Sequence, residues 1–486
     1  MEGGEENIER NLLQKTNEVE RGGGLVAWSV ISQEVRRQAY LAGPMVATNI
    51  SLYLLEVMSF MMVGHLDELS LSSTAVAISL ANVTGFSVIN GMASALETLC
   101  GQAFGAQQYR KLGNQTYGAI FSLLLVSVGL STIWINMGKL LILLGQDPII
   151  AHEAGKFTTF LVPALFAYAT YQPLLRFYQT QSIIMPMLMC SCLTLILHIP
   201  ISWVMVYKSG LNSLGGALAI GMSYWLNVLF LGLHMKHSSV FEKTRIPISM
   251  ELFKEIREFF HLAIPSSVMV CLQWWSYEVV ILLAGLLPNP QLETSVLSVC
   301  LTTLATLFAI PYGLSVAVST RVSNELGAGN PEAARVAVYS VLILAVTELL
   351  TASGAVFASR HVFGYLFSSE KEVVDYVATI APLVSLSVII DSSQCVLSGV
   401  ARGCGWQNIG AYINLASLYL VGVPAAAILG FWLHLKARGL WIGIQLGAIV
   451  QTTMLFVVTY CTDWEKQAIK ARERVFARRT SQNVLV

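Results

Sequence analysis

Glu278 and Asp391 are acidic residues inside stretches that are otherwise apolar enough to cross a membrane: LQWWSYEVVILLAG at 272–285 and VSLSVIIDSSQCVLSG at 384–399. An ionisable group inside lipid is costly unless it is hydrated or paired, so each acid is a candidate functional residue. A carboxyl group in a dry site can exchange a proton near neutral pH. It is neutral when protonated, and when ionised it attracts water or a cation. Such a site makes protons and a cationic substrate compete.

The neighbours of Glu278 favour a functional role. Trp274 and Trp275 precede it by four and three residues, so in a helix they share its face and can form an aromatic wall that accepts a cation. Pro265 lies further back in the same stretch, where the missing backbone donor can kink the helix and make it a hinge. The alternative is a protonated Glu278 that bonds to a neighbouring helix.

Asp391 lies on a polar stripe in an otherwise apolar span. At helical spacing its face carries Ser387, Gln394, Cys395 and Ser398. We expect a substrate cavity lined by polar residues of this half of the chain, with Gln394, Ser398 and Asn414 as candidates.

Other polar residues inside apolar stretches are weaker candidates. Glu56 and His198 are secondary candidates, although a single intramembrane histidine is more often a hydrogen-bonding residue between helices than a proton relay. Glu97 lies close to a helix end and is expected to bond at the interface, and Arg176 is expected to extend its charge to the cytosolic interface. Glu348 is deep in an apolar stretch, with few polar neighbours.

The composition is that of a membrane protein. Of the 486 residues, 55% are hydrophobic and 12% are charged, against about 25% charged in soluble domains. Acidic and basic residues balance at 29 each, so nothing favours nucleic acid as a partner. The first 24 residues lack the pattern of a signal peptide. All eight cysteines lie in or beside apolar segments, and we expect free thiols.

Twelve segments are long and apolar enough to form membrane-spanning helices. Most of the 29 Lys and Arg residues fall on the side of the termini, which places both termini in the cytosol. The fold class is therefore an all-α integral membrane protein with twelve transmembrane helices, in the plasma membrane or the vacuolar membrane. The predicted spans are 37–63, 72–100, 114–137, 157–180, 186–207, 214–235, 261–287, 292–320, 334–358, 374–400, 409–431 and 439–461.

The spans divide into two lobes, which are joined by a polar linker and flanked by polar tails. The linker contains the pattern of an amphipathic helix. WEKQAIKARERVFARR in the C-terminal tail has a second pattern of this kind, which is able to touch anionic lipid. The predicted regions are a disordered cytosolic tail at 1–35, a first lobe of spans one to six at 36–236, a cytosolic amphipathic linker at 237–260, a second lobe at 261–462 and a basic cytosolic tail at 463–486.

The two lobes contain an internal repeat. GMASALETLCGQAFGA at 91–106 and GLSVAVSTRVSNELGA at 313–328 align without gaps at an offset of 222 residues, the separation of Gly91 from Gly313. At the same offset Glu56 falls on Glu278. Because six spans are an even number, the duplicated lobes have the same orientation and are related by an axis along the membrane normal. Transporters built in this way bind their substrates near the middle of the membrane.

Several motifs resemble the multidrug and toxic compound extrusion (MATE) family, in its plant detoxification-protein branch. They occur in order over about residues 35–465: ALETLCGQAFGA, LPNPQLETSVLS, RVSNELGAGNPEAAR, SGVARGCGWQNIGAYIN and GLWIGI. The resemblance implies a two-lobe antiporter that exports organic molecules and is driven by H⁺ or Na⁺, with H⁺ favoured because protons are the usual currency of plant membranes. In the family, spans seven and ten supply coupling carboxylates, which match Glu278 and Asp391. Many bacterial relatives have an aspartate in span one, and the position that matches it here is Ser59, one turn after Glu56. Because the first lobe lacks an acid at that position, the resemblance favours coupling through the second lobe.

The function expected from these features is export of small organic compounds, such as xenobiotics, flavonoids, alkaloids or organic cations, in exchange for protons. We expect a monomer in the bilayer, without cofactor or metal. Alternatives are an exporter of organic anions such as citrate, a carrier of the major facilitator type, and a passive channel. An enzyme is disfavoured because the sequence has no GxGD motif, no GxxxxGK[ST] motif and no His/Cys cluster with metal-ligand spacing.

Overall fold

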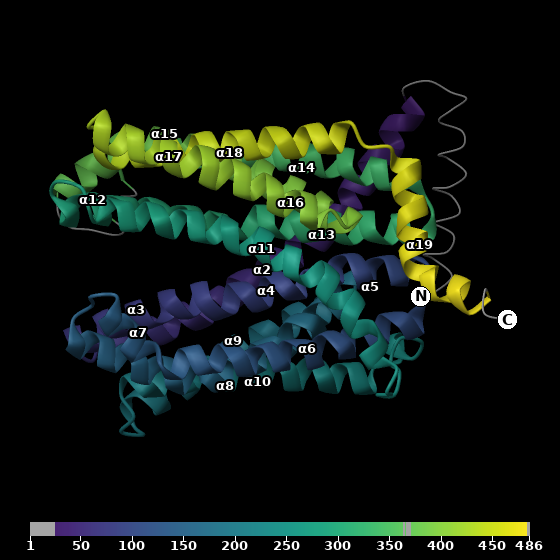
Figure 1. Cartoon of the computed structure of the whole chain (residues 1–486), viewed down its shortest axis with the longest axis horizontal. Helices are drawn as coiled ribbons and strands as arrows, with labels where there is room; N and C mark the ends of the chain where they lie inside the picture. The colour runs from purple at the N-terminus through teal and green to yellow at the C-terminus, as the bar shows by residue number, and fades with distance from the viewer. Residues whose placement is uncertain (1–24, 363–364, 366–370, 484–486) are drawn as a thin grey trace. The chain divides into compact units, whose positions relative to one another are not determined.

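The computed structural model of the chain describes residues 25–362, 365 and 371–483, and this part is built of helices without strands (Figure 1). Two compact units are present, and each is described by itself. The N-terminal unit comprises Pro44–Cys100 and Gln108–Trp275, and the C-terminal unit comprises Met1–Gly43, Gly101–Gln107 and Ser276–Val486. The chain passes from one unit to the other at four places: inside α2, α5 and α11, and between Gln107 and Gln108, just before α6. The lobes and tails expected from the sequence stay predictions.

The N-terminal unit consists of the second part of α2, the first part of α5, most of α11 and the helices between α2 and α11. The helices that begin in or cross this unit are α2 (Leu25–Gly64), α3 (Glu68–Ala81), η1 (Asn82–Phe86), α4 (Ser87–Ala93), α5 (Ala95–Gly105), α6 (Tyr109–Ile135), α7 (Met137–Leu143), α8 (Pro148–Thr180), α9 (Met185–Tyr207), α10 (Ser213–His237), η2 (Ser239–Phe241) and α11 (Leu252–Ala284).

The C-terminal unit contains the remaining helices of the described chain. They are α12 (Pro290–Leu307), α13 (Ala309–Ala328), α14 (Pro331–Ala358), α15 (Lys371–Cys404), α16 (Gln407–Asn414), η4 (Leu415–Gly422), α17 (Val423–Ala427), η5 (Ile428–Trp432), α18 (Lys436–Tyr460) and α19 (Trp464–Asn483). Here α19 lies across the ends of α13 and α14 (Figure 1).

Local sequence signals explain where several helices begin. Asp147 caps α8, because its carboxylate accepts hydrogen bonds from the backbone amides of Ile149 and Ile150 and the next residue, Pro148, already has a helical φ. Asp67 caps α3 through the Ser70 amide at 2.7 Å, which with the Ser70 hydroxyl lowers the pKa of Asp67 below its ordinary value. In both helices an aspartate side chain thus accepts hydrogen bonds from backbone amides of the first turn, which have no partner within the helix.

The predicted membrane spans correspond to helices. Among the described residues ten helical spans are long and apolar enough to cross a membrane, and two of them, Glu68–Gly105 and Gln407–Trp432, each join several of the elements named above. The pair α12 and α13, bent by 40°, adds an eleventh. The predicted span at 157–180 lies in α8, which has 33 residues but is not one of these spans. The buried residues of α8 include Gln172, Arg176 and Gln179, which lower its hydropathy. These three polar side chains are turned inward, where other helices can bind them.

The helices pack closely at small residues. In lipid no hydrophobic effect drives helices together, so association depends on close packing and on hydrogen bonds between helices. A Cβ atom at Gly443 of α18 would collide with the backbone of Ala426, and one at Gly155 of α8 would lie 2.7 Å from the backbone of Gly138. Glycine at these positions allows the helix backbones to approach each other.

Three stretches of π-helix interrupt the α-helical geometry. η1 separates α3 from α4, and η4 and η5 flank α17 in the span that ends at Trp432. A π turn leaves backbone carbonyls without their usual partners, and such turns often mark functional positions. The Val83 carbonyl of η1 accepts hydrogen bonds from the Ser87 hydroxyl at 2.8 Å and from Trp275 at 3.1 Å.

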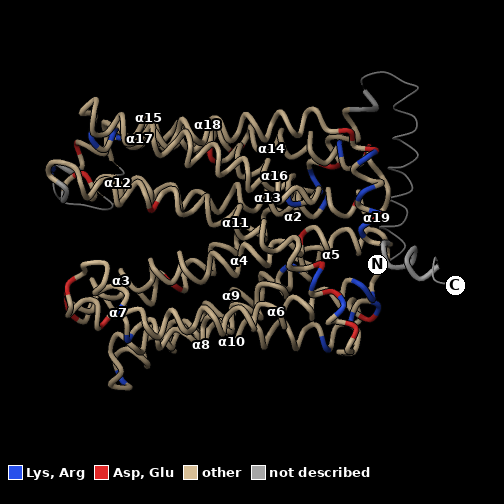
Figure 2. The backbone as a smooth tube through the Cα atoms, in the orientation of Figure 1, with Lys and Arg blue, Asp and Glu red and all other residues tan. Residues whose placement is uncertain are grey.

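Charged residues gather toward the ends of the helices, with few along the middle, as Figure 2 shows. This is the distribution expected of helices whose middle lies in hydrocarbon. The segment predicted as an amphipathic linker contains η2 and a stretch without regular helix before α11 begins at Leu252, and from there the helix continues without a break into the predicted span. All eight cysteines are free thiols.

Candidate functional site

Asp391 is held by a tyrosine that sequence reasoning did not single out. Asp391 is only 8% exposed, and each of its two carboxylate oxygens lies 3.0 Å from the hydroxyl of Tyr277. Tyr277 belongs to the last part of α11 and Asp391 to the middle of α15, so the contact joins two helices of the C-terminal unit. A phenol is a suitable partner because it can donate to an ionised carboxylate or accept from a protonated one.

Glu278 follows Tyr277 directly and points in a different direction. Consecutive residues of an α-helix are about 100° apart around its axis, so Tyr277 and not Glu278 makes the direct contact with Asp391. The side chain of Glu278 is half-buried, and its carboxylate has no hydrogen bond or ion pair to any residue that the structure describes. It is therefore available to a cation or to water.

The two tryptophans of the predicted aromatic wall lie in the N-terminal unit. Trp274 and Trp275 are 42% and 37% exposed. The indole of Trp275 donates to the Val83 carbonyl, so it is fixed on the π turn η1. Pro265 lies in the same part of α11, and the helix continues through it. The proposed roles of wall and hinge stay predictions.

The polar stripe of α15 is buried and bound by its neighbours. The Ser387 hydroxyl accepts from the Trp441 indole of α18 at 2.9 Å, and Gln394 donates to the Ser398 hydroxyl at 2.8 Å. These bonds satisfy polar groups that would otherwise be costly inside a membrane. They hold the side chains of Ser387 and Gln394 in place, one turn before and one turn after Asp391 on α15.

Asn414 is a contact between helices. Its side-chain oxygen accepts a hydrogen bond of 2.7 Å from Gln451 of α18, and both residues are buried. The amide pair ties the start of the π-helical span to α18. Nothing in this contact requires a substrate, so its role as a lining residue stays a prediction.

In the N-terminal unit, Glu56 lies beside an aromatic cluster. The Tyr224 hydroxyl donates to a Glu56 oxygen at 3.0 Å. The ring of Tyr224 packs edge-on against Tyr168 at 5.3 Å, and Phe86 packs on Tyr168 at 4.9 Å. Glu56 and Asp391 thus have the same kind of partner, a tyrosine from another helix of the same unit.

His198 is fully buried and bonded at both ring nitrogens. Nε2 lies 3.0 Å from the Ser59 hydroxyl and Nδ1 lies 2.7 Å from the Ser223 hydroxyl. The ring therefore joins α9 to α2 and α10. Two hydroxyl partners can satisfy a neutral imidazole, since a hydroxyl donates to one nitrogen and accepts from the other.

The expectation for Arg176 is wrong. The side chain does not extend to an interface: it is 1% exposed and forms an ion pair with Glu97 at 3.2 Å, where Glu97 is also 1% exposed. Arg176 donates further hydrogen bonds to Gln179 at 2.8 Å and to Asn90 at 3.1 Å. The buried carboxylate offsets the cost of burying the guanidinium, and sequence alone did not show that the two residues meet.

Comparison with known proteins identifies the family. The model of the MatE family matches residues 44–204 and 265–428, which is more than half of the chain. The chain belongs to the MATE family. The Arabidopsis thaliana proteins DETOXIFICATION 12 and DETOXIFICATION 14 are 55% and 58% identical to this MATE protein, over 97% and 91% of its length and 98% and 91% of theirs.

Solved structures agree with this family. The crystal structure of the eukaryotic MATE transporter AtDTX14 has a TM-score of 0.89 and 57% identity, and the match covers 92% of this chain and 99% of that one. An outward-facing multidrug resistance MATE transporter has a TM-score of 0.77 at 15% identity, which shows the fold alone. The protein is thus a multi-pass membrane transporter with the MATE fold, and not an enzyme.

Proposed function

We propose that this MATE transporter exports small organic compounds in exchange for protons, with Asp391 and Glu278 as the coupling carboxyl groups. The observation that carries the proposal is the contact between Tyr277 and both oxygens of Asp391. Substrates of this class include xenobiotics, flavonoids, alkaloids and organic cations. Binding in the middle of the membrane and alternating access then follow from the two-lobe architecture.

Asp391 suits proton exchange because its surroundings support both protonation states. When the carboxylate is ionised, the Tyr277 hydroxyl donates to it, and hydrogen bonds to charged groups are stronger than those to neutral ones. When Asp391 is protonated, the burial of the neutral acid costs far less than the burial of a charge. Proton uptake and release at Asp391 therefore require only a small rearrangement around Tyr277.

Glu278 is the second carboxyl group of the proposed mechanism. Because it has no partner among the described residues, its negative charge is free to attract a cationic substrate. An arriving proton removes that charge and weakens the attraction. Two carboxyl groups close to one tyrosine therefore allow protons to displace a cation, which is the requirement for exchange.

The charges of the candidate site favour cations over organic anions such as citrate. Asp391 and Glu278 would both repel an anion in their ionised forms, and the bonded residues Ser387, Gln394 and Ser398 that flank Asp391 on α15 are neutral. Protons are favoured over Na⁺ because the similar DETOXIFICATION proteins come from a plant, whose membranes commonly maintain proton gradients. We further propose a monomer with cytosolic termini in the plasma or vacuolar membrane.

Transport in proteoliposomes tests the proposal. Purified protein is reconstituted with a pH gradient, a Na⁺ gradient or neither, and uptake is followed for a panel of organic cations, flavonoids and organic anions. We expect Asp391→Asn and Glu278→Gln each to abolish transport driven by the pH gradient. Glu332→Gln is the control, because Glu332 is 62% exposed at the start of α14. Full proton-driven transport by both acid variants would refute the assignment of these residues. Transport driven only by a Na⁺ gradient would show that Na⁺, and not H⁺, is the coupling ion.

A further inference from the structure

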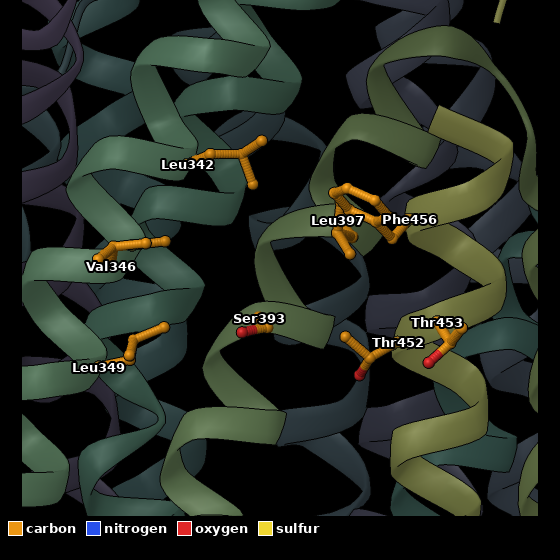
Figure 3. A pocket seen from close by; sticks show the side chains of 9 residues that line it. Leu342, Val346, Leu349, Ser393, Leu397, Thr452, Thr453 and Phe456 are labelled. Atoms are coloured by element: carbon orange, nitrogen blue, oxygen red, sulfur yellow. The ribbon is translucent and has the colours of Figure 1, made fainter. Parts of the chain in front are cut away.

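A groove in the C-terminal unit lies between α14, α15 and α18, and the proposed function gives it no role. Leu342, Val346 and Leu349 point into it from α14, while Ser393 lies on α15 and Thr452 on α18 (Figure 3). The groove has a volume of about 340 Å³. Neither of the proposed coupling carboxyl groups lines it. Its ligand is therefore to be inferred from its own shape, chemistry and surroundings.

The groove is elongated along the helices. On α14 the lining residues Leu342, Val346 and Leu349 are spaced by four and three positions, so they lie one above the other along the helix. Ser393 and Leu397 are four positions apart on α15. With a rise of about 1.5 Å per residue, Leu342 and Leu349 are about 10 Å apart along the helix axis. A ligand that fills this space is narrow and lies parallel to the helices.

The lining of the groove favours a hydrocarbon over a polar ligand. It is mainly apolar, and its three hydroxyl groups belong to Ser393, Thr452 and Thr453. Each hydroxyl donates a hydrogen bond of 2.8 Å to a backbone carbonyl of its own helix. A charged molecule would lose its hydration here without finding a hydrogen-bond donor, and sites for such molecules contain placed polar groups.

The walls of the groove belong to an apolar surface. Val346 on α14 and Phe456 on α18 are 51% and 50% exposed, and Val457 beside the groove is 51% exposed. Both helices are apolar enough to span a membrane. The acid in the apolar part of α14, Glu348, has both carboxyl oxygens buried, and α18 contains no acidic or basic residue over 440–460. An exposed surface of this kind on spanning helices is one that meets lipid.

The start of α14 and the end of α18 lie at the same end of the groove. Figure 3 shows Leu342 and Phe456 toward one end and Leu349 and Thr452 toward the other. In agreement with this, α19, which follows α18, lies across the end of α14 (Figure 1). The residues before Leu342 and those after Phe456 therefore extend toward the same membrane surface.

Two tyrosines and an arginine lie beyond this end of the groove. Tyr339 is 47% exposed, and Tyr460 is 79% exposed with its ring stacked on Phe456 at 6.2 Å. Exposed tyrosines near the ends of spanning helices are typical of the membrane interface. The guanidinium of Arg335 lies over the Tyr339 ring, 5.7 Å from its centre. Because Arg335, Tyr339 and Leu342 are spaced by four and three residues, they share one face of α14 with the groove.

The distances along α14 match the depth of one leaflet. Arg335 and Leu349 are separated by fourteen positions, which is about 21 Å along a helix. A headgroup layer of about 6 Å and half of a hydrocarbon core of about 30 Å add up to about the same depth. If Arg335 lies among the lipid headgroups, Leu349 therefore lies near the middle of the membrane.

Arg335 is able to bind a phosphate group. Its side chain is 48% exposed, and its acidic partner Glu332 lies 3.6 Å away with a side chain that is 62% exposed. Exposed ion pairs of this kind contribute little to stability, so a lipid phosphate can displace Glu332. The planar guanidinium can donate two parallel hydrogen bonds to a phosphate group.

We propose that this groove binds a membrane phospholipid, with one acyl chain along α14 and α18 and the phosphate group at Arg335. In lipid no hydrophobic effect holds helices together, so the packing depends on close contacts. An acyl chain in the groove supplies the contacts that the apolar lining would otherwise lack. The bound lipid thereby holds α14 and α18 against α15. This site does not depend on the proposed function.

Photo-crosslinking of the purified full-length protein tests the site. The probe is a phosphatidylglycerol with a diazirine in the middle of one acyl chain, added to delipidated protein in detergent. Mass spectrometry identifies the labelled peptides. We expect the label to be concentrated in residues 342–349, 393–397 and 452–456. A label that is spread evenly over all spans would overturn the proposal.

Two variants with matched controls separate the groove from the phosphate contact. Val346→Trp fills the groove from its exposed edge and should lose the label. Arg335→Gln should need about five times more probe for the same labelling, as expected for one basic residue near an anionic lipid. The controls are Val128→Trp, at an equally exposed valine of α6, and Arg110→Gln, at an exposed arginine paired with Glu251. Both controls should be labelled like the wild type.

Unlabelled competitors identify the occupant. We expect phosphatidylglycerol to compete better than the diacylglycerol with the same chains, which lacks the phosphate group. Equal competition by the two would reject the phosphate contact, and stronger competition by a sterol would reject a phospholipid as the occupant.

The groove variant has a second form in case it does not fold. Thermal unfolding checks every variant, and unchanged labelling of folded Val346→Trp would reject the groove as the site. If Val346→Trp does not fold, Thr453→Trp replaces it, because Thr453 is an exposed lining residue on the α18 wall. Loss of the label in Thr453→Trp then supports the site, and unchanged labelling rejects it.

Discussion

Gly101 and Ser323 occupy equivalent positions in the internal repeat, and they contact each other. Their separation is the repeat offset of 222 residues, and a Cβ atom at Gly101 would collide with the Ser323 hydroxyl. The neighbouring contacts are exchanged in the same way: Gly105 lies against Asn324, and its repeat mate Gly327 lies against Gln102, the repeat mate of Asn324. Equivalent contacts that swap partners indicate a local two-fold axis through the crossing of α5 and α13.

Substitution of either repeat-related glycine in this crossing should destabilise the protein. An alanine at Gly105 would clash with the Asn324 carbonyl, and one at Gly327 with the Gln102 carbonyl. Overpacking against backbone atoms, which cannot rotate away, is expected to cost about 1–3 kcal/mol or more. Thermal unfolding in detergent measures the change for Gly105→Ala and Gly327→Ala.

The control for this prediction is Gly129→Ala on α6. No atom lies within 4 Å of a Cβ built there, and the residue is exposed. We expect an unchanged or slightly raised melting temperature for the control and a similar loss for both repeat-related variants. If all three variants melted alike, the crossing would not be the tight contact described.

Features that recur at helical spacing could be predicted from the sequence, whereas contacts between residues far apart in the chain could not. The polar stripe of Asp391 was detectable because its members recur at helical spacing on one face. Tyr277 was not singled out, because a tyrosine inside an apolar span carries no signal of the helix it will contact. Glu97 and Arg176 are far apart in the sequence, and only the fold brings their charges together in a buried ion pair.

Breaking the buried ion pair of the N-terminal unit should strongly reduce stability. In Arg176→Met the Glu97 carboxylate remains buried without its partner, for which about 3–5 kcal/mol is expected. The double variant Arg176→Met, Glu97→Gln removes both charges and should recover part of the loss. Thermal unfolding of the single and double variants forms a double-mutant cycle.

An exposed ion pair on the same helix provides the comparison. Lys156 and Glu153 of α8 are 2.8 Å apart, with side chains 45% and 31% exposed. Lys156→Met should change the stability by less than about 1 kcal/mol, because exposed pairs contribute little. An equally small effect of Arg176→Met would mean that the buried pair is hydrated in the membrane.

Removal of the Tyr277 hydroxyl should change the pH dependence of transport. Tyr277→Phe takes away the donor to both oxygens of Asp391 and keeps the ring that packs in the core. A hydrogen bond to a charged group is worth about 1.5–3 kcal/mol, so the ionised form becomes less stable and proton release needs a pH about 1–2 units higher. Proton-driven uptake measured at a series of pH values reports this shift. A profile identical to the wild type would show that the hydroxyl does not tune Asp391.

The start of α19 should lose stability at acid pH. The Asp463 carboxylate binds the Lys466 ammonium at 2.8 Å and caps the helix through the Lys466 amide at 3.1 Å. First the Lys466 side chain and then its amide lower the pKa of Asp463 below the ordinary value. Its contribution to stability is therefore complete above that ordinary value, about 4, and is lost as the pH falls through the lower value of the folded state.

Amide hydrogen exchange in the first turn of α19, corrected for the intrinsic rate at each pH, measures this loss. Asp463→Ala should exchange faster than the wild type at neutral pH and show no further change on acidification. Lys470→Met is the control: Lys470 is an exposed residue one turn beyond Lys466, and its substitution should leave both the exchange and its pH dependence unchanged. Because Asp463 and Lys466 are exposed, added salt should weaken the ion pair, while the cap on the Lys466 amide persists. Equal protection in Asp463→Ala and the wild type at neutral pH would show that the packing of Ala468, Ala471 and Val475, and not the cap, holds the start of the helix.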